Sequence, residues 1–205
     1  MMMISISILL AYLLGSIPSS VWMGKWFRGI DLREYGSGNA GATNAFRVLG
    51  KPIGVVVLLL DMLKGFLAVN LSHLQEDISP GSEGWMILRI VLGALAVAGH
   101  IFPVFAGFRG GKGVATIAGI GLALHPFAAL AAMGVYVLVF LVFKLSALGS
   151  LTAVLSYPVW VILVFQAEYK AIWVFSIAVP LLTIITHRTN IRRLIRGKEK
   201  PVLKN

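Results

Sequence analysis

The residues with the clearest capacity for chemistry lie in one glycine-rich, cationic segment, His100-Ile-Phe-Pro-Val-Phe-Ala-Gly-Phe-Arg-Gly-Gly-Lys-Gly-Val-Ala-Thr116. Its glycines permit tight turns and a close approach of the backbone to a ligand, and they are Gly107, Gly110, Gly111 and Gly113. Arg109 and Lys112 add positive charge, and a helix beginning near Val114 would point its N-terminal amide groups at the loop. This combination is typical of a site for phosphate or another anion.

A second polar segment, Tyr35-Gly-Ser-Gly-Asn-Ala-Gly-Ala-Thr-Asn-Ala-Phe-Arg47, also combines glycines with groups that bind anions. We expect a short helix over about residues 40–49, with Asn39 as its N-cap and Gly50 as its stop. Ser37 and Asn39 would then lie at a helix N-terminus. Arg47, further along this helix, suits bidentate binding of a phosphate group.

A third polar cluster comes from two pieces near the end of the chain. Ser150 is placed to cap a helix beginning near Leu151, and His187-Arg-Thr-Asn190 follows the last apolar run. The cations that would join the helix N-termini at such a site are Arg47, Lys112, Arg188 and Lys25. Together these groups would hold more than one anion.

The elements that carry these segments are membrane spans. Of the 205 residues, 58% are hydrophobic and 13% are charged, and the mean hydropathy is +0.89, which is too apolar for a soluble domain. The net charge of +10 comes from residues that flank apolar runs and from the tail between Arg188 and Lys204. This distribution indicates attraction to membrane lipids rather than to nucleic acid. The chain has no cysteine, which excludes disulfides and a cysteine nucleophile.

The apolar runs predict an all-α integral membrane protein with seven transmembrane helices, in a single domain over residues 1–205. The predicted spans are residues 4–23, 53–71, 86–105, 113–124, 127–143, 151–166 and 171–186. We divide the run from Gly113 to Phe143 into two spans because Pro126 disfavours helix at His125. Several of these spans are shorter than usual, so we expect a thin or partly sunken bundle.

The distribution of charge orients these spans. The loop over 24–52 and the tail are basic and are expected in the cytoplasm, whereas the loop over 72–85 lacks Lys and Arg and is expected outside. The N-terminus then lies outside, and its apolar run, which has no basic n-region, is expected to remain as a span. All three polar segments fall on the cytoplasmic side, where we expect them to converge on one site.

Three motifs give the chain a resemblance to a known family. Gly36-Ser-Gly-Asn-Ala-Gly-Ala-Thr-Asn44, the segment His100–Thr116 and His187-Arg-x-Asn-Ile-x-Arg-Leu194 resemble motifs of the bacterial acyl-phosphate:glycerol-3-phosphate acyltransferases, membrane enzymes usually called PlsY. The similarity covers nearly the whole chain and includes Gly15-Ser-Ile-Pro-Ser-Ser20 and Asp61-x-x-Lys-Gly65. Three separate motifs in the same order make this resemblance specific.

The resemblance implies transfer of a fatty acyl group from acyl phosphate to the 1-hydroxyl of sn-glycerol 3-phosphate, giving lysophosphatidic acid at the cytoplasmic face of the bacterial inner membrane. It implies no cofactor, no metal and no acyl-CoA or acyl carrier protein as donor, and it makes the soluble enzyme that supplies acyl phosphate a candidate partner. The residues it assigns to catalysis are Ser37, Arg47, Lys112 and His187. The residues predicted to bind substrate, from these motifs and from the helix starts together, are Gly38, Asn39, Asn44, Gly110, Gly111, Gly113, Ser150, Asn190, Arg188 and Lys25.

Other polar residues favour structural roles. Asp61 and Lys64 lie three residues apart within a span, and we expect them to pair and to order the site. Glu199 is expected to hold the tail, and His100 either packs within the bundle or takes part in catalysis. The histidines expected to be structural are His73 and His125.

Plainer interpretations exist for the assigned residues. Ser37 and Ser150 can be loop or cap residues, Arg47 can contact a lipid headgroup, and His187 can end a helix favourably. An organic-phosphate transporter is the alternative function, although transporters keep their polar site near the membrane midplane.

Spacing disfavours other chemistries. Gly113 stands where a Walker A loop needs Ser or Thr, no histidine has an aspartate five residues on, and acidic clusters with metal spacing are absent. We predict direct acyl transfer, in which the departing phosphate takes the proton; the alternatives are His187 as general base and a covalent acyl-Ser37.

Overall fold

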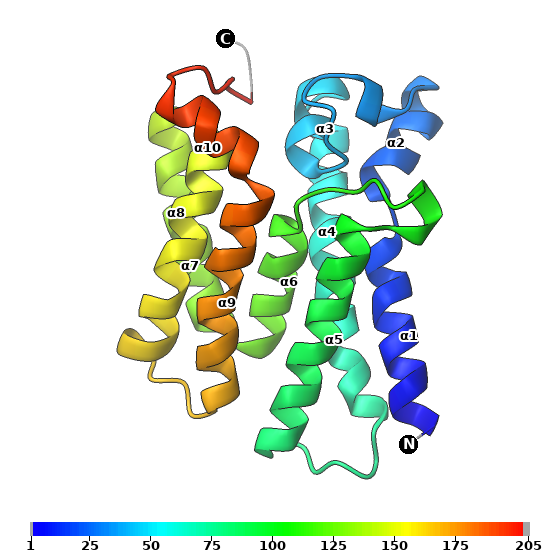
Figure 1. Cartoon of the computed structure of the whole chain (residues 1–205), viewed down its shortest axis with the longest axis vertical. Coiled ribbons are helices and arrows are strands. Elements are labelled where there is room, and N and C mark those ends of the chain that lie inside the picture. The colour runs from blue at the N-terminus through cyan, green and yellow to red at the C-terminus, as the bar shows by residue number, and fades with distance from the viewer. Residues whose placement is uncertain (1, 203–205) are drawn as a thin grey trace. The chain divides into compact units, whose positions relative to one another are not determined.

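The computed structural model describes residues 2–202, and within this range the chain forms helices and loops without any β-strand. The all-α prediction is therefore confirmed for the described part of the chain. The helices fall into two compact units, one that ends at Leu124 and one that begins at His125 (Figure 1). The two units are described separately.

In the first unit, the longer helices pack side by side, and α2, α3 and the loop after α5 lie at one end (Figure 1). Its α-helices are α1 (Met2–Ser16), α2 (Ser19–Arg28), α3 (Ala42–Val48), α4 (Lys51–Asn70), α5 (Glu83–Ile101) and α6 (Val114–Leu124). Its 3₁₀ helices are η1 (Leu32–Glu34), η2 (Leu71–Leu74) and η3 (Val104–Ala106). The start of α6 at Val114 confirms the predicted helix after the glycine loop.

In the second unit, α8 packs against both α7 and α9, and the short α10 crosses one end (Figure 1). These helices are α7 (Pro126–Phe143), α8 (Ser146–Pro158), α9 (Lys170–Thr186) and α10 (Arg188–Ile195). A π-helical segment, η4 (Val159–Val164), continues α8 beyond Pro158. The basic tail begins with α10, and Lys204 lies outside the described residues.

Each predicted span falls on helical segments, and some cover more than one: 4–23 covers parts of α1 and α2, and 151–166 covers parts of α8 and η4. The segments long and apolar enough to cross a membrane singly are Lys51–Leu74, Glu83–Ala106, Pro126–Phe143 and Ser146–Val164. Two bent pairs, α1 with α2 and α9 with α10, also pass when each pair is taken as one span. The predicted span over 113–124 is α6, whose 11 residues are too few for a full crossing. The count of seven crossings and the sidedness of the termini stay predictions.

Prolines interrupt the helices at two places. His125 caps α7, since its Nδ1 accepts a hydrogen bond of 3.3 Å from the Ala128 amide, and the predicted break before Pro126 is confirmed. The expectation of one continuous helix over 4–23 needs correction, because α1 and α2 are separate helices bent by 41° at Pro18. The same rule explains both breaks, since a proline disfavours helix at the residue before it.

Asn39 is not the helix cap that the sequence predicted. The helix expected over 40–49 is the shorter α3, and its N-cap is Gly41, in an extended conformation with φ of −145°. The chain from Gly36 to Gly41 instead forms a turn held by other contacts, described below.

Ser150 is not a helix cap either. The helix expected from Leu151 begins earlier, at Ser146, so Ser150 lies within α8 and is buried. The extra turn packs closely against α7, where Gly149 lies against the ring and carbonyl of Tyr136. This packing extends the helix past the point that the local sequence suggested.

Arg89 forms a hydrogen bond with the last turn of the short helix α6. The arginine extends from α5, and its Nη2 donates to the carbonyl of Ala123 in the last turn of α6, at 2.6 Å. Its guanidinium also lies 4.4 Å from the centre of the Trp85 ring. The last carbonyls of a helix lack partners within that helix, and inside a bilayer water cannot supply them. Arg89 therefore allows α6 to end within the apolar unit.

We expect Arg89→Leu to lower the thermal unfolding midpoint of the purified protein in detergent. The substitution leaves the Ala123 carbonyl unbonded, at a cost of about 1–3 kcal/mol. Arg28→Leu, which removes an exposed arginine at the end of α2, is the matched control and should leave the midpoint nearly unchanged. Equal midpoints for the two variants would contradict this role of Arg89.

Candidate active site

The glycine loop has a strained backbone. After α5, a 3₁₀ turn leads to Gly107 and Phe108, which have φ values of 61° and 59°, and Gly113 has a φ of 84° just before α6. A positive φ is ordinary for glycine but costs energy for a residue such as phenylalanine. The surrounding contacts must therefore hold this loop in its shape.

Backbone contacts fasten the loop to the end of α5. The amides of Gly110 and Gly111 donate to the carbonyls of Ile101 and His100, each at 3.1 Å. A Cβ atom on Gly110 would meet the His100 carbonyl, and one on Gly111 would meet Nε2 of the His100 ring. Only glycine fits at both positions. Lys112 follows directly after this closely packed turn.

The loop that contains Ser37 is organised by Asn44. Asn44 is 1% exposed; its Oδ1 accepts from the Ser37 amide at 2.8 Å, and its Nδ2 donates to the carbonyls of Leu32 and Tyr35, each at 3.0 Å. These three bonds hold the loop while Ser37 itself remains exposed. Asn44 thus has a structural role in the free protein, and its contact with substrate stays a prediction.

The two glycine loops meet within the first unit. A Cβ on Gly111 would lie 2.7 Å from the carbonyl oxygen of Ala40, so the backbones of the two loops are in direct contact there. The segment that carries Ser37 and the segment that carries Lys112 are therefore neighbours, as the sequence predicted. Arg47 lies on α3 directly after the first loop and is half-buried.

Arg33 joins the two loops and was missed by the sequence analysis. Its Nη1 donates to the carbonyls of Ala106 and Arg109, at 2.6 and 3.3 Å, while its Nε and Nη2 contact the Asp31 carboxylate. Asp31 also accepts from the Arg33 amide at the start of η1. The only local signal was an Asp-x-Arg sequence, and spacing alone could not show that the guanidinium would reach a loop so distant in the chain.

A buried polar network lies beneath these loops. Asp61 is 2% exposed and pairs with Lys64 at 2.9 Å, so the predicted pairing is confirmed. Asp61 also accepts from the Ser19 hydroxyl at 3.0 Å and lies 3.7 Å from Nδ1 of His100. The same nitrogen lies 3.2 Å from the Thr116 hydroxyl on α6. His100 therefore packs within the helices, and its ring supports the turn at Gly111.

In the second unit, the predicted site residues cluster at the junction of α9 and α10. His187 is buried, and its Nδ1 lies 3.0 Å from the carbonyl of Thr183. Because a carbonyl can only accept, Nδ1 carries the hydrogen in the neutral ring and Nε2 carries the lone pair. Asn190 donates to Glu199 at 2.7 Å, which connects the tail to α10, and the role predicted for Glu199 stays a prediction. Arg188 is exposed at the start of α10.

The remaining predictions are placed as follows. Lys25 is exposed on α2, Gly38 has a φ of 72° in the Ser37 loop, and Asn39 lies in the same loop. Between residues 2 and 202 no group of three or more His, Asp or Glu side chains is arranged to hold a metal ion. The structural interpretation of His73 is supported by its edge-on contact with Trp85, at 5.4 Å between ring centres.

Substitution of Gly111 provides a sharp test of the loop. Gly111→Ala should raise the KM for the phosphate-bearing substrate by about tenfold or more, because the added methyl must displace the His100 ring or the Ala40 carbonyl. Gly134→Ala is the matched control, since a Cβ at Gly134 on α7 meets nothing within 4 Å. An unchanged KM in folded Gly111→Ala protein would show that the close packing is unimportant for the site.

Substitution of Arg33 tests the connection between the loops. Arg33→Gln should increase amide hydrogen exchange over 106–113 and raise KM more than it lowers kcat, whereas exposed Arg28→Gln should change neither. Exchange equal to that of the unsubstituted protein would show that the loop holds its shape without Arg33.

The contact between Asp31 and Arg33 should depend on pH. Hydrogen bonding to Arg33 lowers the pKa of Asp31 from 3.8 to about 2. Since the folded-state pKa is the lower one, the pair contributes fully above pH 3.8 and is lost as the pH falls through about 2. The exchange protection of the loop should therefore be constant from neutral pH down to pH 4.

Apolar helices long enough to span a bilayer define a helical integral membrane protein. A family model described as glycerol-3-phosphate acyltransferase matches residues 5–197. The chain belongs to the glycerol-3-phosphate acyltransferase family. A relative of that name from Enterococcus faecalis is 43% identical over 205 residues, covering 97% of this chain and 91% of the relative. One from Fusobacterium nucleatum is 38% identical over 196 residues, covering 94% of each.

Two solved structures share the fold over nearly the whole chain. Both are crystal structures of PlsY (YgiH), an integral membrane glycerol 3-phosphate acyltransferase. The glycerol 3-phosphate form has a TM-score of 0.85 and 38% identity, and the lysophosphatidic acid form has a TM-score of 0.83 and 37% identity. Each comparison covers 97% of this chain and 94% of the other. The predicted membrane class and the resemblance to the PlsY family are confirmed.

Proposed function

We propose that this protein transfers a fatty acyl group from acyl phosphate to the 1-hydroxyl of sn-glycerol 3-phosphate, giving lysophosphatidic acid and inorganic phosphate. The observation that carries the proposal is the contact between Gly111 and the Ala40 carbonyl, which brings together the loop that carries Ser37 and the loop that carries Lys112. The forms of the similar PlsY structures, with glycerol 3-phosphate and with lysophosphatidic acid, support the acceptor and the product.

The glycine loop is the proposed binding site for the phosphate of the acceptor. The backbone of Gly110, Gly111 and Gly113 is proposed to lie beside the phosphate, and Lys112 to contribute a charge at the start of α6. Arg47 is proposed to bind a phosphate group beside it, as a planar guanidinium does well. The other residues proposed to contact substrate are Lys25, Gly38, Asn39, Asn44, Ser150, Arg188 and Asn190.

The proposed chemistry is direct acyl transfer. Acyl phosphate is a mixed anhydride with a good leaving group, so the hydroxyl oxygen of the acceptor attacks the acyl carbon and the bond to the phosphate oxygen breaks. The hydroxyl proton goes to the departing phosphate. The protein then has to align two anions and offset their repulsion, and alignment of this kind can contribute roughly 7–11 kcal/mol. Lys112 and the helix start would stabilise the developing negative charge.

Two other mechanisms make different demands on the chain. In the first, His187 accepts the hydroxyl proton, which the lone pair on Nε2 permits. In the second, Ser37 forms a covalent acyl intermediate. An acylated protein trapped with donor alone and mapped to Ser37 would overturn direct transfer. Near-normal kcat in His187→Ala would exclude the histidine as base, since general bases typically contribute about 10²–10⁴-fold.

The experiment that tests the function is reconstitution of the purified protein in lipid vesicles. With acyl phosphate and glycerol 3-phosphate we expect lysophosphatidic acid and phosphate in equal amounts, and with acyl-CoA in place of acyl phosphate we expect no product. Product from acyl-CoA alone would contradict the proposed donor. Uptake of glycerol 3-phosphate into the vesicles without any product would instead favour an organic-phosphate transporter.

Lys112→Gln supplies the residue-level test of the same proposal. Removing one donor to a developing anion typically costs about 10²–10³-fold in rate, so we expect a loss of that order in kcat/KM. Lys51→Gln, an exposed lysine at the start of α4, is the matched control and should retain full activity. Comparable activity in both variants would show that Lys112 takes no part in catalysis.

A further inference from the structure

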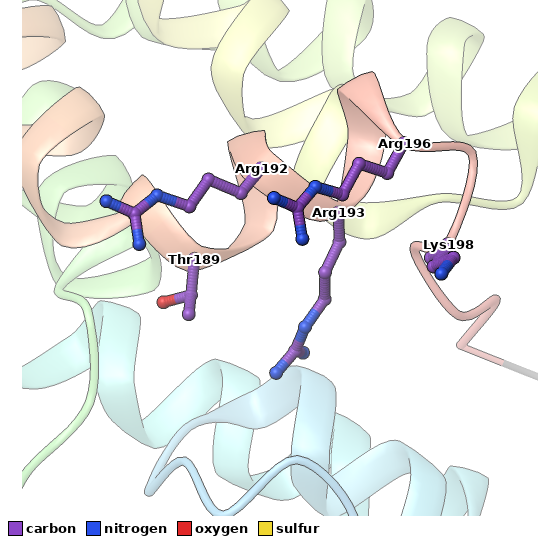
Figure 2. A pocket seen from close by; sticks show the side chains of 5 residues that line it. All are labelled: Thr189, Arg192, Arg193, Arg196 and Lys198. Carbon is purple, nitrogen blue, oxygen red and sulfur yellow. The ribbon is translucent and has the colours of Figure 1, made fainter.

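The second unit carries a cluster of positive charge that the proposed reaction does not use. A pocket of about 210 Å³ lies along α10, lined by Thr189, Arg192, Arg193, Arg196 and Lys198 (Figure 2). All five residues are exposed. Among residues 2–202 none of the four cations forms an ion pair with a carboxylate. Such a concentration of unneutralised charge in a confined space calls for an anionic ligand.

The pocket is built by the fold rather than by a loose tail. Gly197, with a φ of 63°, reverses the chain after α10, and its amide donates to the Leu194 carbonyl at 3.0 Å. The amide of Lys198 then donates to the Arg193 carbonyl at 2.8 Å, which turns Lys198 back toward the arginines. Further along, Glu199 accepts from Asn190, so its carboxylate fastens the tail to α10.

The position of α10 relative to α9 places the pocket at a membrane surface. α9 is an apolar helix of 17 residues, and α10 is bent by 70° from it. Since membrane spans are tilted by only about 20° from the bilayer normal on average, a helix at this angle runs close to the membrane plane. The arginines of α10 also exclude this helix from the hydrocarbon layer.

The exposed apolar residues of α10 favour a lipid over a soluble anion as the ligand of this pocket. Ile195 is 82% exposed beside the arginines; Ile191 lies one turn before it and Leu194 directly before it, on a short helix that is otherwise polar or charged. A helix with apolar side chains on one face and arginines on the other is typical of the interface between headgroups and acyl chains. Free phosphate would contact only the cations and would leave Ile195 exposed to water.

We propose that this pocket binds the phosphate of an anionic phospholipid headgroup and so anchors α10 at the membrane surface. The guanidinium groups of Arg192, Arg193 and Arg196 offer paired donors to phosphate oxygens, and the Thr189 hydroxyl and Lys198 ammonium add further donors. Ile195 contacts the acyl chains of the same leaflet. The proposal rests on residues of the second unit alone and does not depend on the function proposed for the glycine loops.

The test uses the purified full-length protein in zwitterionic detergent and follows its thermal unfolding midpoint as lipid is added. A ligand that binds only the folded state raises the midpoint. We expect phosphatidylglycerol to raise it, and phosphatidylcholine with the same chains and inorganic phosphate to have little effect. The shift should decrease as salt is added, because the contacts are electrostatic and exposed.

Two double variants make the test specific. In R192Q/R193Q, the phosphatidylglycerol concentration for half of the shift should rise by about tenfold or more, since each basic residue near an anionic surface contributes roughly a fivefold factor. R28Q/K51Q removes two exposed positive charges elsewhere and should keep the response of the unsubstituted protein. If R192Q/R193Q yields too little folded protein, the single substitution Arg196→Gln carries the same test.

Several outcomes would overturn the proposal. An equal response in R192Q/R193Q and R28Q/K51Q would mean that the lipid acts through general charge rather than through the pocket. Protection by inorganic phosphate as strong as that by phosphatidylglycerol would identify a site for the free anion. Equal protection by phosphatidylcholine would show that charge plays no part.

Discussion

A buried carboxylate needs partners, and in the first unit Asp61 meets that need with groups from several helices. Lys64 pairs with it and also donates to the carbonyl of Ile17 at the bend between α1 and α2, at 3.0 Å. Ser19 donates to it from the start of α2, and His100 on α5 lies beside it. Loss of either charge would leave the other unpaired in an apolar setting. The bend at Pro18 and the helices around it are therefore fixed together.

The glycine loops depend on that network through His100. The His100 ring lies between Asp61 and the backbone of Gly111. The backbone carbonyl of His100 accepts a hydrogen bond from the Gly111 amide. Arg33 fastens the other side of the same loop from outside the helices. A strained turn with Phe108 at a positive φ persists because both sides are held. The proposed anion site is thus rigid before any ligand arrives, which limits the entropy lost on binding.

The sequence predicted the fold class and most of the helices because apolar runs and prolines are local signals. Pro126 stops α6, and the start of α6 at Val114 follows from the glycine loop. The pairing of Asp61 with Lys64 followed from helical spacing and the cost of unpaired charge in a membrane. Asn39 was misplaced as a cap because Asn44 holds the preceding loop in a turn and α3 begins after it. Ser150 was misplaced because α8 begins earlier, where it packs against α7. Sequence rules for caps include neither kind of contact.

The amino-acid sequence alone determined that this chain enters a membrane, where its glycine loops lie in the chain, and which family it belongs to, because composition and motif order are properties of the chain. Only the tertiary structure decided that Arg33 reaches the carbonyl of Ala106, that His100 supports Gly111 and that Arg89 completes α6. These contacts join residues far apart in sequence, and they form only when packing brings the backbones within hydrogen-bonding distance. The spacing of residues along the chain does not predict the distances between them in the folded protein.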